Sequence, residues 1–171
     1  MDRTVLVVDD ESEIRDALIR VLRTDGYDVL QAPGGTEALQ MLQDNPVQLL
    51  ISDNSMPGMS GIELLKVVRV RHPSVMRIML TGDRDPEVPV RSINESEVYR
   101  FIRKPWNNSD LRTIVHFAFR VGELEEEKRQ LLALARKERE VRKRMETDED
   151  PADLEAELLL LAETEAKLLD G

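Results

Sequence analysis

The first 120 residues alternate between two hydrophobic patterns. Five short apolar runs are typical of strands, and the segments between them carry apolar residues every three or four positions, as one face of a helix does. The predicted strands are residues 5–8, 27–32, 47–52, 75–80 and 99–103. The first, third and fourth runs are almost unbroken, which favours strands buried on both faces of a parallel sheet.

This alternation of strand and helix is typical of an α/β protein. We therefore predict a five-stranded, doubly wound parallel sheet with right-handed crossovers, helices on both faces and strand order 2-1-3-4-5. Pro86 and Pro89 fall in the fourth helical segment, so a helix there should be short or distorted. The fifth helix should begin near Ser109 and Asp110.

After residue 120 the composition shifts to Glu, Lys, Arg, Leu and Ala, which are good helix formers. We predict a first domain at 1–120 and an extended helical or coiled-coil tail at 121–171. The tail should hold two helices, at about 121–146 and 151–169, separated by an acidic break that ends in proline. The fifth helix of the first domain should run into this tail.

The leucines of the tail follow an incomplete heptad-like spacing. Lys128 and Glu138 interrupt the first stripe and Glu165 interrupts the second, so a strict coiled-coil seam is not established. The basic block 136–144 and the acidic block 146–157 could pair in a helical hairpin or between two antiparallel chains. The alternative is two solvated helix faces without a partner, although isolated short helices are marginal in water.

Composition narrows the classes of function. The chain has 171 residues, a net charge of −10 and no cysteine, which excludes disulfides and thiolate metal sites. The acidic balance argues against nucleic-acid binding as the function, since neutralising phosphates needs excess Lys and Arg. No apolar run approaches the length that crosses a bilayer, so we expect a cytoplasmic protein without a membrane partner.

Polar side chains stand where the predicted strands end. Asp9 and Asp10 close the first strand, Asp53 the third, Thr81 the fourth and Lys104 the fifth. The carboxyl ends of parallel strands meet at one crevice, where ligands bind. Three carboxylates, a hydroxyl and an ammonium would then converge, a set suited to a divalent cation and a phosphoryl group.

Each residue type predicts a role in this crevice. Mg²⁺ prefers carboxylate oxygens, so Asp10 and Asp53 could bind it directly and Asp9 through a water. Asp53 is the candidate nucleophile, because carboxylates can form aspartyl phosphates. Lys104 would neutralise charge on the phosphoryl group, and the Thr81 hydroxyl could donate to one of its oxygens. For a single Asp at a strand end, helix capping is an equally good interpretation.

Four motifs together resemble the receiver domain of bacterial two-component response regulators, a flavodoxin-like fold, over about residues 3–120. They are Val7-Val8-Asp9-Asp10-Glu11, the run from Asp53 to Gly61, Thr81-Gly82 and Lys104-Pro105. The resemblance implies transfer of a phosphoryl group to Asp53 from a partner histidine kinase or phosphotransfer protein. It implies Mg²⁺ at Asp10, Asp53 and the Ser55 carbonyl, with Asp9 nearby, and contacts of Thr81 and Lys104 with the acyl phosphate.

The resemblance also identifies Phe101 as a switch aromatic that turns inward when Thr81 moves toward phosphate; ordinary strand packing is the alternative. Our leading hypothesis is a phosphorylation-controlled switch, not a turnover enzyme, that forms a homodimer through its fifth helix and tail. Alternatives are a phosphorylation-independent helical adaptor and an excerpt of a longer regulator with an enzymatic output domain. A Mg²⁺-dependent phosphatase would normally carry an acidic residue where Ser55 stands.

Overall fold

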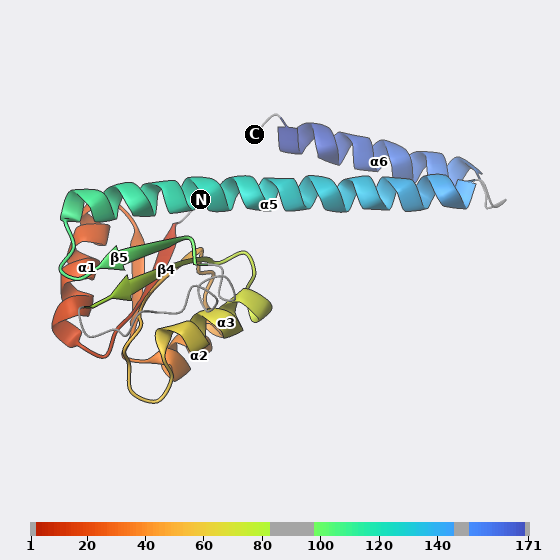
Figure 1. Cartoon of the computed structure of the whole chain (residues 1–171). Coiled ribbons are helices and arrows are strands. Elements are labelled where there is room, and N and C mark those ends of the chain that lie inside the picture. The colour runs from red at the N-terminus through yellow and green to blue at the C-terminus, as the bar shows by residue number, and fades with distance from the viewer. Residues whose placement is uncertain (1–2, 83–97, 146–150, 170–171) are drawn as a thin grey trace. The chain divides into compact units, whose positions relative to one another are not determined.

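A five-stranded parallel sheet forms the centre of the computed structural model, which describes residues 3–82, 98–145 and 151–169. Its strands are β1 (Thr4–Val8), β2 (Asp28–Ala32), β3 (Leu49–Asp53), β4 (Met76–Thr81) and β5 (Arg100–Arg103). They lie in the order β2-β1-β3-β4-β5, and all neighbours are parallel (Figure 1). The predicted sheet and its strand order are therefore confirmed.

Helices cover both faces of this sheet. The helices of the described residues are α1 (Ser12–Thr24), α2 (Gly35–Asp44), α3 (Gly61–Arg71), α5 (Asn108–Met145) and α6 (Pro151–Leu169). Those that pack on the sheet are α1, α2, α3 and the first turns of α5. Successive side chains of a strand point to opposite faces. Val5 and Val7 of β1 pack with α1 and the first turns of α5, whereas Leu6 and Val8 pack with α2 and α3. The unbroken apolar runs thus serve two cores at once.

Four strands, β2 to β5, begin one or two residues later than the sequence predicts. For β2 and β3 the reason is that their expected first residues bond elsewhere. The Tyr27 N–H donates to the Leu22 carbonyl at 3.2 Å and closes the end of α1, so β2 starts at the next residue. The Val47 N–H donates to the Asn45 carbonyl at 3.0 Å in the turn after α2, and β3 starts two residues later. Local turn bonds decide both boundaries.

The chain forms two compact units, Met1–Gly122 and Glu123–Gly171. α5 belongs to both, because it is one continuous helix of 38 residues. The fifth helix of the sheet domain and the first tail helix are therefore a single element. Gly122 lies within it, where a Cβ would stand 2.9 Å from Cγ of Met76, so the close approach to β4 explains a glycine inside a helix.

The second unit is a helical hairpin. α6 folds back antiparallel along the distal part of α5 (Figure 1). Val141 of α5 and Leu154 of α6 are buried, and Arg144 Nη1 lies 3.2 Å from Glu157 Oε2. Of the arrangements that the charge blocks left open, an intramolecular hairpin is the one formed within this unit.

Some predictions fall outside the described residues. These are the distorted helix around Pro86 and Pro89, and the acidic break before Pro151. Among the helices that the structure does describe, none is both long enough and apolar enough to cross a membrane.

Candidate functional site

The carboxyl edge of the sheet gathers the polar residues that the sequence analysis selected. Val8 pairs with Ser52 across β1 and β3, and Thr81 pairs with Arg103 across β4 and β5. The residues that follow each pair therefore lie at the same edge. The Lys104 N–H also donates to the Thr81 carbonyl at 2.8 Å, which ties the ends of β4 and β5 together.

Three carboxylates form the centre of the site. Asp9, Asp10 and Asp53 each offer one oxygen, and these oxygens all lie within 4.8 Å of one another. Asp9 and Asp53 are buried, whereas Asp10 is exposed. Oxygen donors at this spacing, with one side open to solvent, suit a hard divalent cation such as Mg²⁺ that keeps several waters. The chemistry of the donor set fits the predicted ion.

Lys104 bridges the two buried carboxylates. Its Nζ lies 2.7 Å from Asp9 Oδ2 and 2.6 Å from Asp53 Oδ1. The second oxygens of both carboxylates accept backbone hydrogen bonds, from the Glu11 N–H at 2.9 Å and the Ser55 N–H at 2.8 Å. All four oxygens of this buried pair are thus held in fixed directions, which pre-organises the site.

The pKa values follow from burial and from this bridge. Burial raises the pKa of Asp9, although hydrogen bonds from Lys104 and from the Glu11 N–H oppose the shift. For Lys104, burial alone would lower the pKa, but its bonds to Asp53 and Asp9 outweigh burial and raise it. Lys104 therefore stays an ammonium, while Asp9 bears the cost of a buried charge. A cation beside Asp9 would reduce that cost.

The loop after β3 returns directly to the nucleophile candidate. The Gly61 N–H donates to the Asn54 carbonyl at 3.0 Å, and a Cβ on Gly61 would overlap the Asp53 carbonyl oxygen. Only glycine permits that approach without displacing the backbone of Asp53. Sequence reasoning recognised the motif that ends at Gly61 but missed this contact, which no local pattern reveals.

Arg15 is a second residue that sequence reasoning missed. Its Nη1 donates to the Asp9 carbonyl at 2.7 Å and to the Asp10 carbonyl at 3.3 Å. Its Nε donates to Gln31 Oε1 at 3.3 Å on neighbouring β2. Arg15 thereby holds the backbone that carries two of the carboxylates. An arginine one turn into the helix after the acidic pair was the available signal.

The predicted switch residues lie on the last two strands. Thr81 is half-buried at the end of β4. Phe101 on β5 is also half-buried and packs against the core that α2 and α3 cover. Its neighbour across the strands is Met79. The packing of Phe101 matches the ordinary alternative, and its role as a switch stays a prediction.

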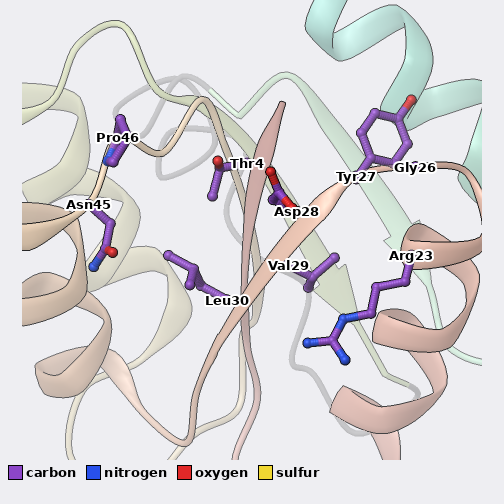
Figure 2. Close-up of a pocket in the computed structure, with 9 residues that line it drawn as sticks. All are labelled: Thr4, Arg23, Gly26, Tyr27, Asp28, Val29, Leu30, Asn45 and Pro46. Carbon is purple, nitrogen blue, oxygen red and sulfur yellow. The ribbon is translucent and has the colours of Figure 1, made fainter. Parts of the chain in front are cut away.

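A separate open cavity of about 670 Å³ lies at the opposite edge of the sheet, near the first residues of β1 and β2 (Figure 2). It is lined by Thr4, Arg23, Gly26, Tyr27, Asp28, Val29, Leu30, Asn45 and Pro46. None of these is a predicted site residue. The cavity is therefore separate from the carboxylate cluster, which lies at the edge where ligands bind in open α/β sheets.

The sequence is similar to a known domain family and to curated proteins. The model of the response regulator receiver domain matches residues 5–116. The hydrogenase transcriptional regulatory protein HoxA of Cupriavidus necator is 43% identical over 103 residues, which cover 60% of this chain and 21% of HoxA. HoxA of Bradyrhizobium diazoefficiens is 36% identical over 124 residues, 72% of this chain and 25% of that protein. The chain spans about a fifth to a quarter of the length of these curated relatives.

Solved structures agree. The signal receiver domain of an HD domain-containing protein from Pseudomonas fluorescens Pf-5 has a TM-score of 0.68 at 34% identity, over 71% of this chain and 98% of that one. A structure described as an adenylate cyclase from Rhodopirellula baltica has a TM-score of 0.71 at 30% identity, over 78% and 98%. With its acidic cluster, strand order and matched residues, the chain belongs to the response regulator receiver domain family.

Proposed function

We propose that this chain is a phosphorylation-controlled switch that accepts a phosphoryl group on Asp53 from a histidine kinase or phosphotransfer protein. The observation that carries the proposal is the convergence of Asp53 with two further carboxylates and Lys104. Two-component signalling is the setting in which receiver domains of response regulators work, and the family match supports it.

The residues divide the work of phosphoryl transfer. Mg²⁺ would be held by Asp10, Asp53 and the Ser55 carbonyl, with Asp9 nearby, and would supply positive charge to the phosphoryl oxygens. An oxygen of Asp53 forms the bond to phosphorus as the nitrogen–phosphorus bond of the donor phosphohistidine breaks. The departing imidazole takes up a proton.

Lys104 already bonds Asp53 and is positioned to follow the new charge. When the carboxylate becomes an acyl phosphate, the ammonium would move its hydrogen bond to a phosphoryl oxygen. The Thr81 hydroxyl would donate to another oxygen. Phe101 would respond by turning inward, because a local gain of charge can bias a packed element that has two arrangements.

The output of this switch passes to the helical tail. α5 starts against the sheet and ends in the hairpin, so one element joins the phosphorylated unit to the tail. We propose that phosphorylation changes association of the tail, either with a second copy or with a partner. The chain would be a substrate of the transfer and would not turn over a substrate of its own. A longer regulator with a further output domain is compatible with the same role.

The test treats the full chain with Mg²⁺ and acetyl phosphate, or with beryllofluoride. After acetyl phosphate we expect intact-mass analysis to show one phosphoryl group on the wild type and none on Asp53→Asn. With either reagent we expect light scattering to show a changed assembly for the wild type alone. Phosphorylation of Asp53→Asn would refute Asp53 as the acceptor. An unchanged assembly of protein modified at Asp53 would refute the tail as output and favour the phosphorylation-independent adaptor.

A further inference from the structure

The hairpin of α5 and α6 buries only one stripe of each helix. Within residues 127–145 and 153–169, every side chain that is not exposed falls on this stripe, which we call the seam. Its members on α5 are Leu131, Leu134, Glu138, Val141 and Met145, and on α6 they are Leu154, Leu158, Leu161 and Leu168. The spacings of three, four and, between Leu161 and Leu168, seven residues are those of a coiled-coil contact.

A second apolar stripe remains uncovered beside the seam. On α6 it consists of Leu159, Ala162, Ala166 and Leu169, again at spacings of three and four residues. On α5 it is continued by Leu132 and Ala135. All six side chains are exposed, with Leu159 at 65% and Leu169 at 62%. We call this set the outer stripe.

The outer stripe forms one face of the hairpin and does not wrap around it. Three of its α6 residues and both α5 residues follow a seam member by one residue, a rotation of about 100°. Ala166 follows Glu165, the exposed residue that stands between Leu161 and Leu168 in the seam register. Two antiparallel helices are related by a two-fold axis normal to the plane of the pair, so equal offsets from the seam lie on the same side. The apolar residues of both helices therefore share one broad face.

Such a face is expected to be covered, because a helix with apolar residues on more than one side is normally buried. α6 has this character, since it carries leucines both on the seam and on the outer stripe. A free apolar face of this extent is typical of an association site.

The charges of the two helices indicate which helix of a second copy would lie against α6. α6 carries five acidic residues and one basic residue, whereas residues 136–144 of α5 carry six basic and two acidic. If α6 of a second copy lay against α6 of the first, acidic side chains would face each other. If α5 of a second copy lay against α6 of the first, basic side chains would face acidic ones. Charge therefore favours pairing of α6 with α5 over pairing of α6 with α6.

We propose that the outer stripe binds the outer stripe of a second copy of this chain, so that two hairpins form a four-helix bundle. α6 of each copy lies against α5 of the other, and the two hairpins point the same way. Arg144 is level with Glu157 within each hairpin, so this alignment brings the basic residues 136–144 level with Glu157, Glu163 and Glu165 of the second copy's α6. The proposal goes beyond the proposed function, because the interface itself does not require phosphate on Asp53.

The first test compares two neighbouring leucines in the unphosphorylated full chain. Leu159 lies on the outer stripe and Leu160 on the other side of α6, and their exposures are 65% and 64%. We expect light scattering to give the mass of two chains for the wild type and for Leu160→Glu, and of one chain for Leu159→Glu. Ala162→Glu should behave like Leu159→Glu, and circular dichroism should show unchanged helix content in all three.

Each other outcome decides against the interface. A monomeric wild type at every concentration, a dimeric Leu159→Glu, or equal dissociation of Leu160→Glu would overturn it. Because no phosphate donor is present, these results are separate from those on Asp53: the interface can fail while Asp53 is still phosphorylated, and the converse.

A second test fixes which helices meet. The chain has no cysteine, so single-cysteine variants report without background. After exchange of subunits, a mixture of Ala135→Cys and Ala162→Cys should form a disulfide-linked dimer under mild oxidation far more readily than either variant alone. Preferential cross-linking of Ala162→Cys to itself would overturn the pairing of α6 with α5.

Discussion

The two units of this chain differ in how completely they bury their apolar side chains. In the sheet unit, strand leucines such as Leu6 and Leu50 are completely buried because helices cover both faces. In the hairpin, two helices cover only one stripe each, and Leu159 and Leu160 remain mostly exposed. The comparison teaches that three layers complete a core within one chain, whereas two helices leave a face that another surface must complete.

The largest expected difference between the units comes from removing a leucine side chain. Leu50→Ala on β3 leaves a cavity between buried neighbours, and we expect a loss of about 3 kcal/mol in the free energy of unfolding. Leu160→Ala on α6 removes a side chain that is 64% exposed, and the expected loss is below about 0.5 kcal/mol. Urea unfolding followed by circular dichroism measures both.

Losses of similar size at Leu50 and Leu160 would break the comparison. They would mean that the hairpin of one chain buries Leu160 in solution, contrary to its position off both stripes. The slope of the unfolding curve serves as the control, because it should stay constant if only stability changes.

A smaller effect is expected where the backbone of the sheet unit is packed most tightly. Gly61→Ala places a Cβ against the Asp53 carbonyl oxygen, and we expect a loss of about 2 kcal/mol, typical of overpacking. The same displacement should weaken Mg²⁺ binding, measured by titration calorimetry. Gly58→Ala is the matched control: its φ of +79° predicts strain, but no atom lies within 4 Å of the added Cβ.

If Gly58→Ala reduced Mg²⁺ affinity as much as Gly61→Ala, loop strain and not the approach to Asp53 would be the cause. If Gly61→Ala bound Mg²⁺ as well as the wild type, the loop would not position Asp53.

The smallest expected effect concerns the start of α3. The Glu63 N–H donates to Ser60 Oγ at 3.3 Å, and the Ser60 N–H donates to Glu63 Oε2 at 2.9 Å, which makes a capping box. Ser60→Ala should cost about 1 kcal/mol of stability. The hydrogen bonds from the Ser60 backbone and hydroxyl lower the pKa of Glu63 below its ordinary value of 4.5.

The sign of the pH dependence follows from that direction. A lowered pKa means that Glu63 contributes fully above about pH 4.5 and that its contribution is lost as the pH falls through the lowered pKa. Unfolding midpoints of the wild type and Glu63→Gln, measured from pH 7 to pH 3, should therefore converge as Glu63 is protonated. Parallel curves would show that the carboxylate does not stabilise the cap.

For the candidate site, the sequence predicts which residues gather at one edge of the sheet but not how they contact one another. Asp9, Asp53, Thr81 and Lys104 could be assigned to one crevice from order alone, because parallel strands present their carboxyl ends at one edge. The contacts within the crevice could not. Lys104 forms salt bridges with both Asp9 and Asp53 because of where β5 lies beside β4, and that register is a property of the packed sheet.

Residues outside the recognised motifs show the limit most clearly. Arg15 holds the carbonyl of Asp9 from the first turn of α1, and Gly61 approaches Asp53 across a loop of seven residues. Neither contact has a periodic signal, since both depend on the path of the backbone in space.

By itself, the sequence determined the alternation of strands and helices, the two cores and the gathering of acidic and basic residues at one edge, because hydrophobic periodicity and strand direction are local properties. It left open whether the tail folds into a hairpin, and which stripe of α6 that hairpin covers. Only the tertiary structure decided these points. Packing a helix against one neighbour necessarily chooses one face of it, and the face that is not chosen becomes visible only when the first contact is known.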